Sequence, residues 1–148
     1  MKQFINVNDI GNLDLAVKES NSNPVYYVQY AYARICSIIR NLAGEGITRR
    51  RCTQKELELL KAPEERELTL HIAALTDEII AAAKAYDPAR ITHYVEELAT
   101  KFHKFYAVCR VKGADEGLMQ ARLTLCADTA ITIKNVLTLM KINAPEKM

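Results

Sequence analysis

The sequence predicts an all-α fold, a bundle of about five helices with the longer ones packed side by side. Apolar residues recur at spacings of three and four through every long segment, which is the period of an amphipathic helix. The 4 prolines and most of the 5 glycines lie at the borders of these segments. No segment reads as a convincing strand. With 148 residues, 49% of them hydrophobic, the chain can build one sizeable core.

The first predicted helix begins at Pro24 and ends near Ala43. Asn23 is a favourable N-cap, Pro24 suits the first helical position, and Gly44 with Gly46 stops the helix. At about 100° per residue, its side chains separate into two faces. The core face holds Val25, Val28, Ala31, Tyr32, Ile35, Ile39 and Leu42. The polar face holds Tyr26, Gln29, Tyr30, Ala33, Arg34, Ser37, Arg40 and Asn41.

Two further helices follow, each with its own start signal. Thr53 and Glu56 form a capping box that opens a short helix with Leu57 and Leu60 turned inward, and Pro63 ends it. The next helix begins with acidic residues, which its N-terminal dipole favours. Its acidic start is Glu64, Glu65 and Glu67, and its apolar stripe is Leu68, Ile72, Leu75, Ile79 and Ala82 or Ala83.

The two remaining helices are long and carry continuous apolar stripes. Asp87 is the predicted cap of the first, and Pro88 is its first residue. Its stripe consists of Ile91, Val95, Leu98, Phe102, Phe105 and Cys109. A break around Gly113 to Gly117 precedes the last helix. The seam of that helix is Leu118, Ala121 or Arg122, Leu125, Thr129, Ile133, Val136 and Met140, widened by Leu123, Cys126, Ala130 and Leu137.

The charge is unevenly distributed, although the net charge of +2 does not by itself indicate a nucleic-acid binder. Residues 1–55 hold 8 Lys or Arg against 4 Asp or Glu, whereas residues 56–90 hold 4 against 8. The basic excess therefore lies near the first helix, where Arg49, Arg50 and Arg51 form a cluster. These three arginines are candidate phosphate contacts, and the alternative is a solvated surface.

The four cysteines, Cys36, Cys52, Cys109 and Cys126, are far apart and form no C-x-x-C pair, so neither a zinc site nor a redox motif is predicted. We expect reduced thiols and a cytoplasmic protein, with Cys52 in an open loop and the others packed as small apolar residues. No apolar run has the length of a signal peptide or a membrane span.

Catalytic constellations are not found in the sequence. His71, His93 and His103 share no metal-ligand spacing, and Glu96 and Glu97 point to different helix positions. A glycine-rich phosphate loop is also missing. We therefore expect no metal, no cofactor and no catalytic residue in this chain.

The polar face of the first helix is the strongest candidate site. Tyr26 and Tyr30 stand one turn apart, beside Gln29 and Arg34. Flat rings, an amide and a cation are the groups that bind an unstacked nucleotide base. The alternative is that these tyrosines lie half-buried against a neighbouring element with their hydroxyls in water.

Four segments carry a resemblance to a known family: NPVYYVQYAYARI, YVEELATKFHKFY, ARLTLC and the final APEKM. Together they resemble the C-terminal anticodon-binding domain of arginyl-tRNA synthetase, a class Ia synthetase domain often called DALR. The resemblance runs from about Asn12 to Met148. It implies that residues 1–22 are a lead-in from a missing catalytic domain and that residues 23–148 are the anticodon-binding domain.

The resemblance also implies the site residues. In the family, the helix matching Pro24 to Arg40 faces the anticodon loop, so we expect Tyr26, Gln29, Tyr30 and Arg34 to contact bases, with Tyr30 and Arg34 foremost. The family's Ala-Pro-x-x-Met ending matches residues 144–148, which implies that Met148 folds back near the same pocket; the alternative is a frayed tail. Arg122 is expected either to contact RNA or, as we favour, to pin Asp115 or Glu116.

Two positions depart from the family pattern. Tyr32 stands where the family commonly has a histidine, and the helical projection places it toward the core. Leu139-Met140-Lys141 replaces a Leu-Leu-Gly turn, which removes the glycine that usually relaxes a helix end before Ile142. The first departure leaves open whether position 32 takes part in binding, and the second leaves open the pose of Met148.

The parent reaction implied by the resemblance is ATP-dependent attachment of arginine to tRNA(Arg). Neither the H-x-G-H motif nor the K-M-S-K-type loop occurs here, so we expect the ATP site to belong to the missing catalytic domain and this chain to be inactive alone. The expected partners are tRNA(Arg) and that domain, with no membrane and no DNA. The rival hypothesis is a helical module that packs its tyrosine face on a partner protein, and the chain is either an excised fragment or a stand-alone relative.

Overall fold

The computed structural model describes residues 22–148, which form six α-helices and no strand. The helices are α2 (Pro24–Gly44), α3 (Gln54–Leu57), α4 (Pro63–Ala73), α5 (Leu75–Ala85), α6 (Ala89–Val108) and α7 (Glu116–Leu139). The all-α prediction is confirmed. The predicted lead-in, apart from Ser22, lies outside the described residues.

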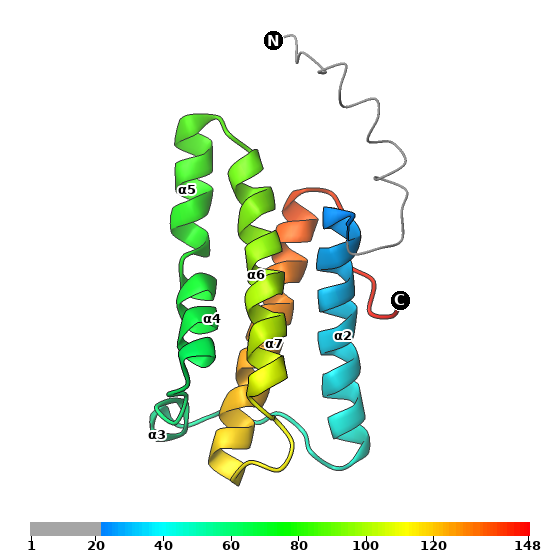
Figure 1. Ribbon diagram of the computed structural model, residues 1–148, viewed down its shortest axis with the longest axis vertical. Helices are drawn as coiled ribbons and strands as arrows, with labels where there is room; N and C mark the ends of the chain where they lie inside the picture. The colour runs from blue at the N-terminus through cyan, green and yellow to red at the C-terminus, as the bar shows by residue number, and fades with distance from the viewer. Residues whose placement is uncertain (1–21) are drawn as a thin grey trace.

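Three long helices, α2, α6 and α7, run side by side, and α4 and α5 continue one another along the far side of α6 (Figure 1). α6 packs against α2, α4, α5 and α7, so it lies at the centre of the arrangement. α2 forms one edge of the bundle, here called the α2 edge. α4 and α5 form the other, here called the α4–α5 edge, and α3 packs against α7.

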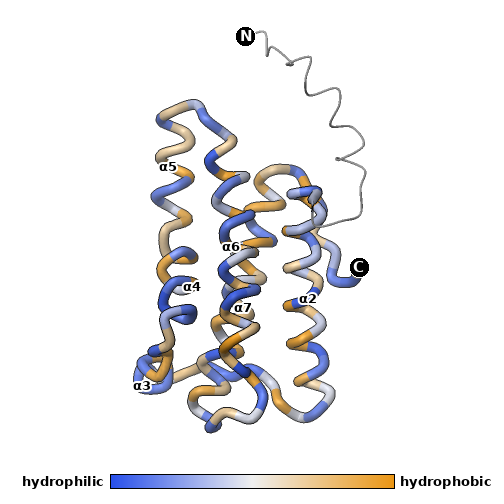
Figure 2. The backbone as a smooth tube through the Cα atoms, in the orientation of Figure 1, coloured by the Kyte–Doolittle hydropathy of each residue, from blue (hydrophilic) through white to orange (hydrophobic). Residues whose placement is uncertain are grey.

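The core lies where the apolar sides of these helices meet. All of the predicted stripe on α6 is buried, with Leu98, Phe102 and Phe105 fully enclosed. The core-facing seam of α7 is largely buried as well, and so is Tyr32 on α2, as predicted. Figure 2 shows hydrophobic and hydrophilic residues alternating along the long helices, as expected for helices with one apolar side. Within residues 22–148, no helix is both long and apolar enough to span a membrane.

The predicted start signals work as capping groups. Asn23 Oδ1 accepts hydrogen bonds from the backbone N–H of Val25 and of Tyr26, at 3.0 and 3.4 Å. Thr53 and Glu56 form the predicted capping box. Asp87 Oδ1 accepts from the N–H of Ala89 at 3.1 Å, although α6 begins one residue later than predicted.

One predicted helix is divided in two at Ala74, and a contact from α6 explains the division. In a continuous helix, the His71 carbonyl would accept the N–H of Leu75. Here it accepts the Tyr94 hydroxyl at 2.8 Å and the N–H of Ala74 at 3.2 Å, which closes a tighter turn. The prediction of a single helix was wrong because this interruption comes from a distant tyrosine rather than from a local proline or glycine.

Three predicted burial states on α2 and α3 were also wrong. Val25, assigned to the core, is 40% exposed because it lies in the first turn of α2, beside a small groove between α6 and α7. Ala33, assigned to the polar face, is buried on the side of α2 that the C-terminal segment follows. Leu57, assigned inward, is 42% exposed because α3 has only 4 residues and packs mainly on α7.

The end of α7 takes the turn that the sequence left open. Lys141 has φ 61°, the left-handed conformation that favours glycine. The N–H of Lys141 donates to the Thr138 carbonyl, and the N–H of Ile142 donates to the Leu137 carbonyl at 2.8 Å. This is the hydrogen-bond pattern of a Schellman end, so lysine occupies the position where the family glycine was expected.

Candidate nucleic-acid interface

The outer surface of α2 is divided into three strips, because successive side chains turn by about 100°. Tyr27 and Arg34 face α6, and Gln29 and Arg40 face the C-terminal segment. The outward strip between them holds Tyr26, which is half-buried, and Tyr30. Tyr30 is 40% exposed and Arg34 is also exposed. The four predicted base contacts therefore share one helix face but belong to three different environments.

The strip toward α6 forms an aromatic cluster around His103. The imidazole ring lies 5.5 Å from the Tyr27 ring and 6.2 Å from the Tyr30 ring, centroid to centroid, in tilted arrangements. Arg34 Nη1 lies 3.3 Å from His103 Nδ1, and its guanidinium carbon lies 5.2 Å from the centre of the Tyr106 ring. Arg34 is thus held by a hydrogen bond and a cation–π contact together.

The contact with Arg34 fixes the protonation of His103. A guanidinium has only donors, so Nδ1 of His103 must accept and the ring proton lies on Nε2. Burial, and then the charge of Arg34, holds the pKa of His103 below its ordinary value. Nε2 is buried and has no hydrogen-bond partner among residues 22–148. The cluster therefore contains a neutral imidazole with one unused donor.

The strip on the other side of α2 holds the C-terminal segment, residues 141–148. Gln29 Nε2 donates to the Asn143 carbonyl at 2.8 Å, and Arg40 Nη2 donates to the Glu146 carbonyl at 3.5 Å. The segment therefore folds back on α2, where the resemblance also implied that it would lie. Met148 at its end is 54% exposed.

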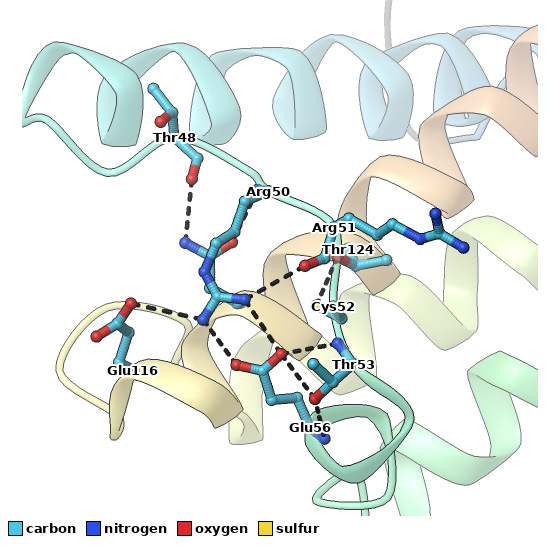
Figure 3. Close-up of polar contacts among 9 residues, drawn as sticks. Thr48, Arg50, Arg51, Cys52, Thr53, Glu56, Glu116 and Thr124 are labelled. Atoms are coloured by element: carbon cyan, nitrogen blue, oxygen red, sulfur yellow. Dashed lines mark hydrogen bonds and ion pairs between the residues drawn. The ribbon is translucent and has the colours of Figure 1, made fainter.

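The predicted arginine cluster does not converge on one site. Arg50 forms a bidentate ion pair with Glu56, at 2.6 and 3.1 Å, and also approaches Glu116 at 3.5 Å (Figure 3). Hydrogen bonds from Arg50 and from the Thr53 backbone lower the pKa of Glu56 to about 2. Arg50 therefore ties the loop to α3 and α7, with its charge already matched by carboxylates.

The flanking arginines and Cys52 have different surroundings. Burial raises the pKa of Asp128, and the charge of Arg49 acts in the opposite direction. Arg51 is exposed and forms no ion pair among the described residues. Cys52, expected in an open loop, is half-buried with Sγ 3.3 Å from Thr124 Oγ1 (Figure 3). Of the three arginines, Arg49 and Arg51 are the ones not held in an ion pair.

Arg122 has the structural role that we favoured, but with a different partner. Its Nε lies 2.6 Å from Glu65 Oε1, and its Nη1 donates to the Arg110 carbonyl at 2.7 Å. Glu65 is 1% exposed, and its second oxygen accepts the N–H of Ala62. Asp115 or Glu116 was the wrong partner because Arg122 extends across to α4, a direction that local sequence spacing does not reveal.

Three members of the aromatic cluster around His103 were not identified from the sequence, namely Tyr27, Tyr106 and His103 itself. Tyr27 adjoins the recognised tyrosines, and its hydroxyl lies 3.2 Å from Thr100 Oγ1 on α6. His103 and Tyr106 lie three residues apart in YVEELATKFHKFY, so a helical projection of that segment would have placed them on one side. Their approach to Tyr30 depends on how α2 and α6 pack. Among residues 22–148, no three His, Cys, Asp or Glu side chains are placed to bind a metal ion.

Comparison with known proteins assigns the fold to a family. The family model of the DALR anticodon binding domain matches residues 28–148. The arginine–tRNA ligases of Acetivibrio thermocellus and Ruminiclostridium cellulolyticum are 52% and 51% identical over 137 residues, which are 93% of this chain and 24% of each relative. The chain therefore spans about a quarter of the length of these curated relatives.

Solved structures give the same result for the fold. Thermus thermophilus arginyl-tRNA synthetase matches with a TM-score of 0.72 and 30% identity, over 88% of this chain and 22% of that one. Arginyl-tRNA synthetase from Plasmodium falciparum matches with a TM-score of 0.70 and 26% identity, over 91% and 23%. Together with the family match over most of its length, these similarities show that the chain belongs to the DALR anticodon-binding domain family.

Proposed function

We propose that this chain is the tRNA-recognition domain of an arginyl-tRNA synthetase and that it binds the anticodon region of tRNA(Arg) along the α2 edge. The observation that carries the proposal is the cluster of Tyr30, Arg34 and His103. It combines an exposed ring and a held cation within one patch, beside a neutral imidazole whose Nε2–H is buried. These are the groups that stack on and hydrogen-bond to a base that has left its helical stack.

Binding in this proposal combines stacking with electrostatic docking. A base stacks on Tyr30 or Tyr26, while Arg34 adds positive charge beside it. α2 contains no acidic residue, so nothing on that helix repels a phosphate backbone. Arg49 and Arg51 are proposed phosphate contacts beyond the end of α2. Met148, at the end of the C-terminal segment that lies along α2, is proposed to contact the same region.

The complete reaction belongs to a longer protein in this proposal. The relatives are about four times as long as the region they share with this chain. We assign ATP binding and arginine attachment to a catalytic domain outside this chain, which is then the second partner beside tRNA(Arg). This chain itself uses no cofactor and works in the cytoplasm, in keeping with its free cysteines among the described residues.

The test is a fluorescence-anisotropy titration with an arginine tRNA transcript and an anticodon-substituted transcript, each at two salt concentrations. Wild-type protein should prefer the natural anticodon, and its affinity should fall steeply as salt rises. Tyr30→Ala should remove the preference. Tyr86→Ala is the matched control, because Tyr86 is 90% exposed at the tip of the α4–α5 edge.

The rival function, protein docking through the tyrosine face, predicts the opposite salt response. A mainly apolar protein interface is little affected by ionic strength, whereas contacts with several phosphates are strongly affected. Exposed apolar side chains that a protein partner could cover also lie outside α2, for example Leu70 on α4 and Leu139 at the end of α7. Binding without anticodon preference at either salt concentration would reject anticodon reading by this chain and favour the protein-docking hypothesis.

A further inference from the structure

The polar side chains of α2 that border the C-terminal segment bind its backbone rather than its side chains. Gln29 Nε2 donates to the carbonyl of Asn143, and Arg40 Nη2 donates to the carbonyl of Glu146. Gln29 and Arg40 lie eleven positions apart on α2, about three turns, so they hold the segment at two separate points. Contacts to carbonyls fix the path of the chain whatever side chains it carries.

Two other features direct the segment onto α2. Lys141, in its left-handed conformation, ends α7 and turns the chain, with the N–H of Ile142 bonded to the Leu137 carbonyl. Ile142 and Ala144 then pack, half-buried, against the core. The apolar contacts hold one side of the segment, and Gln29 and Arg40 hold its carbonyls. The exposed end at Met148 is therefore attached to a segment fixed in several places.

These contacts change the role of Gln29. One amide N–H of Gln29 is already used by the Asn143 carbonyl, at a distance typical of a well-formed hydrogen bond. We propose that Gln29 and Arg40 are positioning residues that clamp the C-terminal segment beside the outward strip of α2, making it one wall of the RNA site. In this proposal, Gln29 acts on RNA through the segment instead of reading a base. The clamp stands independently of the proposed function, and only the statement that the segment is a wall of the RNA site rests on it.

The clamp itself is testable without RNA. Gln29→Met keeps the length of the side chain and removes the donor. Gln54→Met is the matched control, because the Gln54 side chain, on α3, donates to Glu58 at the surface. The measurement is the rate at which carboxypeptidase releases Met148 from the full chain. Loss of one exposed hydrogen bond should speed the release about two- to tenfold in Gln29→Met. Unchanged release, with the helical circular dichroism intact, would overturn the clamp.

A double-mutant comparison tests the action on RNA. Gln29→Met should weaken binding of the arginine tRNA transcript about two- to tenfold in the full chain. In a chain ending at Ile142, which lacks the Asn143 carbonyl and whose fold is checked by circular dichroism, the same substitution should have no further effect. An equal loss in both chains would mean that Gln29 touches RNA directly, and would overturn the positioning role. If wild-type protein bound no tRNA, the proposed function would fail, while the release assay would still decide the clamp.

Discussion

The two edges of the bundle flank the same central helix but carry opposite charge. α2 contains Arg34 and Arg40 and no acidic residue. The α4–α5 edge contains Glu64, Glu65, Glu67, Asp77 and Glu78, against Arg66 and Lys84. A polyanion is therefore attracted to one edge and repelled by the other. Under the proposed function, this difference in charge would direct the RNA to the α2 edge, although both edges pack on α6.

The largest expected effect is on stability and concerns Glu65, a residue of the α4–α5 edge whose carboxylate is buried. Arg122→Met should lower the free energy of unfolding by about 3 kcal/mol, because it leaves the Glu65 carboxylate buried without its cation. Urea unfolding measures the change. Arg66→Met, at an exposed neighbour of Glu65, is the control and should change stability by less than about 0.5 kcal/mol. An equal effect of both variants would show that Glu65 belongs to the surface charge of this edge.

The next effect compares the two edges directly. Tyr30→Ala should weaken tRNA binding by about 1–3 kcal/mol if one base stacks on this ring, whereas Tyr86→Ala on the opposite edge should leave the affinity unchanged. Arg34→Met should also reduce the slope of log affinity against log salt by about 0.7 to 1, and Arg66→Met should not. Equal losses from variants on both edges would refute the assignment of RNA to the α2 edge.

A smaller effect concerns two helix ends, one for each edge. Lys141 directs the C-terminal segment toward the α2 edge, and Tyr86 ends α5; both residues are left-handed, with φ 61° and 53°. Replacing either by glycine should stabilise the fold by about 0.5–1 kcal/mol, since glycine adopts this conformation without steric cost. The two gains should add in thermal unfolding, because the sites are independent. A loss of stability in Lys141→Gly would mean that the lysine side chain itself holds the turn.

The smallest expected effect is a pH dependence that belongs to the α2 edge. The pKa of His103 is lowered in the folded state, so the unfolded chain takes up a proton first as the pH falls. The contribution of His103 to the free energy of unfolding should therefore be fully present above about pH 6.5, the ordinary histidine pKa. It should decrease as the pH falls below that value. His103→Gln should flatten this part of the profile.

Two comparisons isolate that pH effect. His93→Gln, at an exposed position on α6, is the matched variant for loss of an imidazole. The pKa of Glu56 is lowered to about 2, so its contribution is lost only below the ordinary glutamate range and does not overlap. A profile between pH 5 and about 7 that is the same for wild type and His103→Gln would show that the imidazole is not held neutral by the cluster.

Much of the fold could be predicted because its signals are local. The α6 stripe, the Asn23 cap and the Thr53–Glu56 capping box each depend on residues within a few positions of one another. The break at Ala74 could not be predicted, because it is set by Tyr94 from another helix. Local sequence patterns therefore predict where helices form and how they are capped. A helix break that is caused by packing against another helix can be seen only in the folded bundle.

The candidate site divides in the same way. Tyr30 and Arg34 could be selected because they share a helix face. His103 could not be selected, because its meeting with Arg34 spans 69 positions of sequence and depends on the crossing of two helices. Gln29 was assigned to base contact because its bond to Asn143 joins residues 114 positions apart. The chemistry of a residue could be read from sequence, but its partner could not.

The joint between α4 and α5 has a consequence for how this domain tolerates insertions and deletions. His71 Nε2 lies 2.9 Å from the Tyr94 carbonyl, the Tyr94 hydroxyl donates to the His71 carbonyl at 2.8 Å, and the two rings stack at 4.4 Å. This reciprocal attachment anchors the end of α4 to the first half of α6. The hairpin beyond it, residues 75–90, packs mainly on α6. We expect a change in the length of this hairpin to leave the aromatic cluster around His103 undisturbed, because the joint lies between the two.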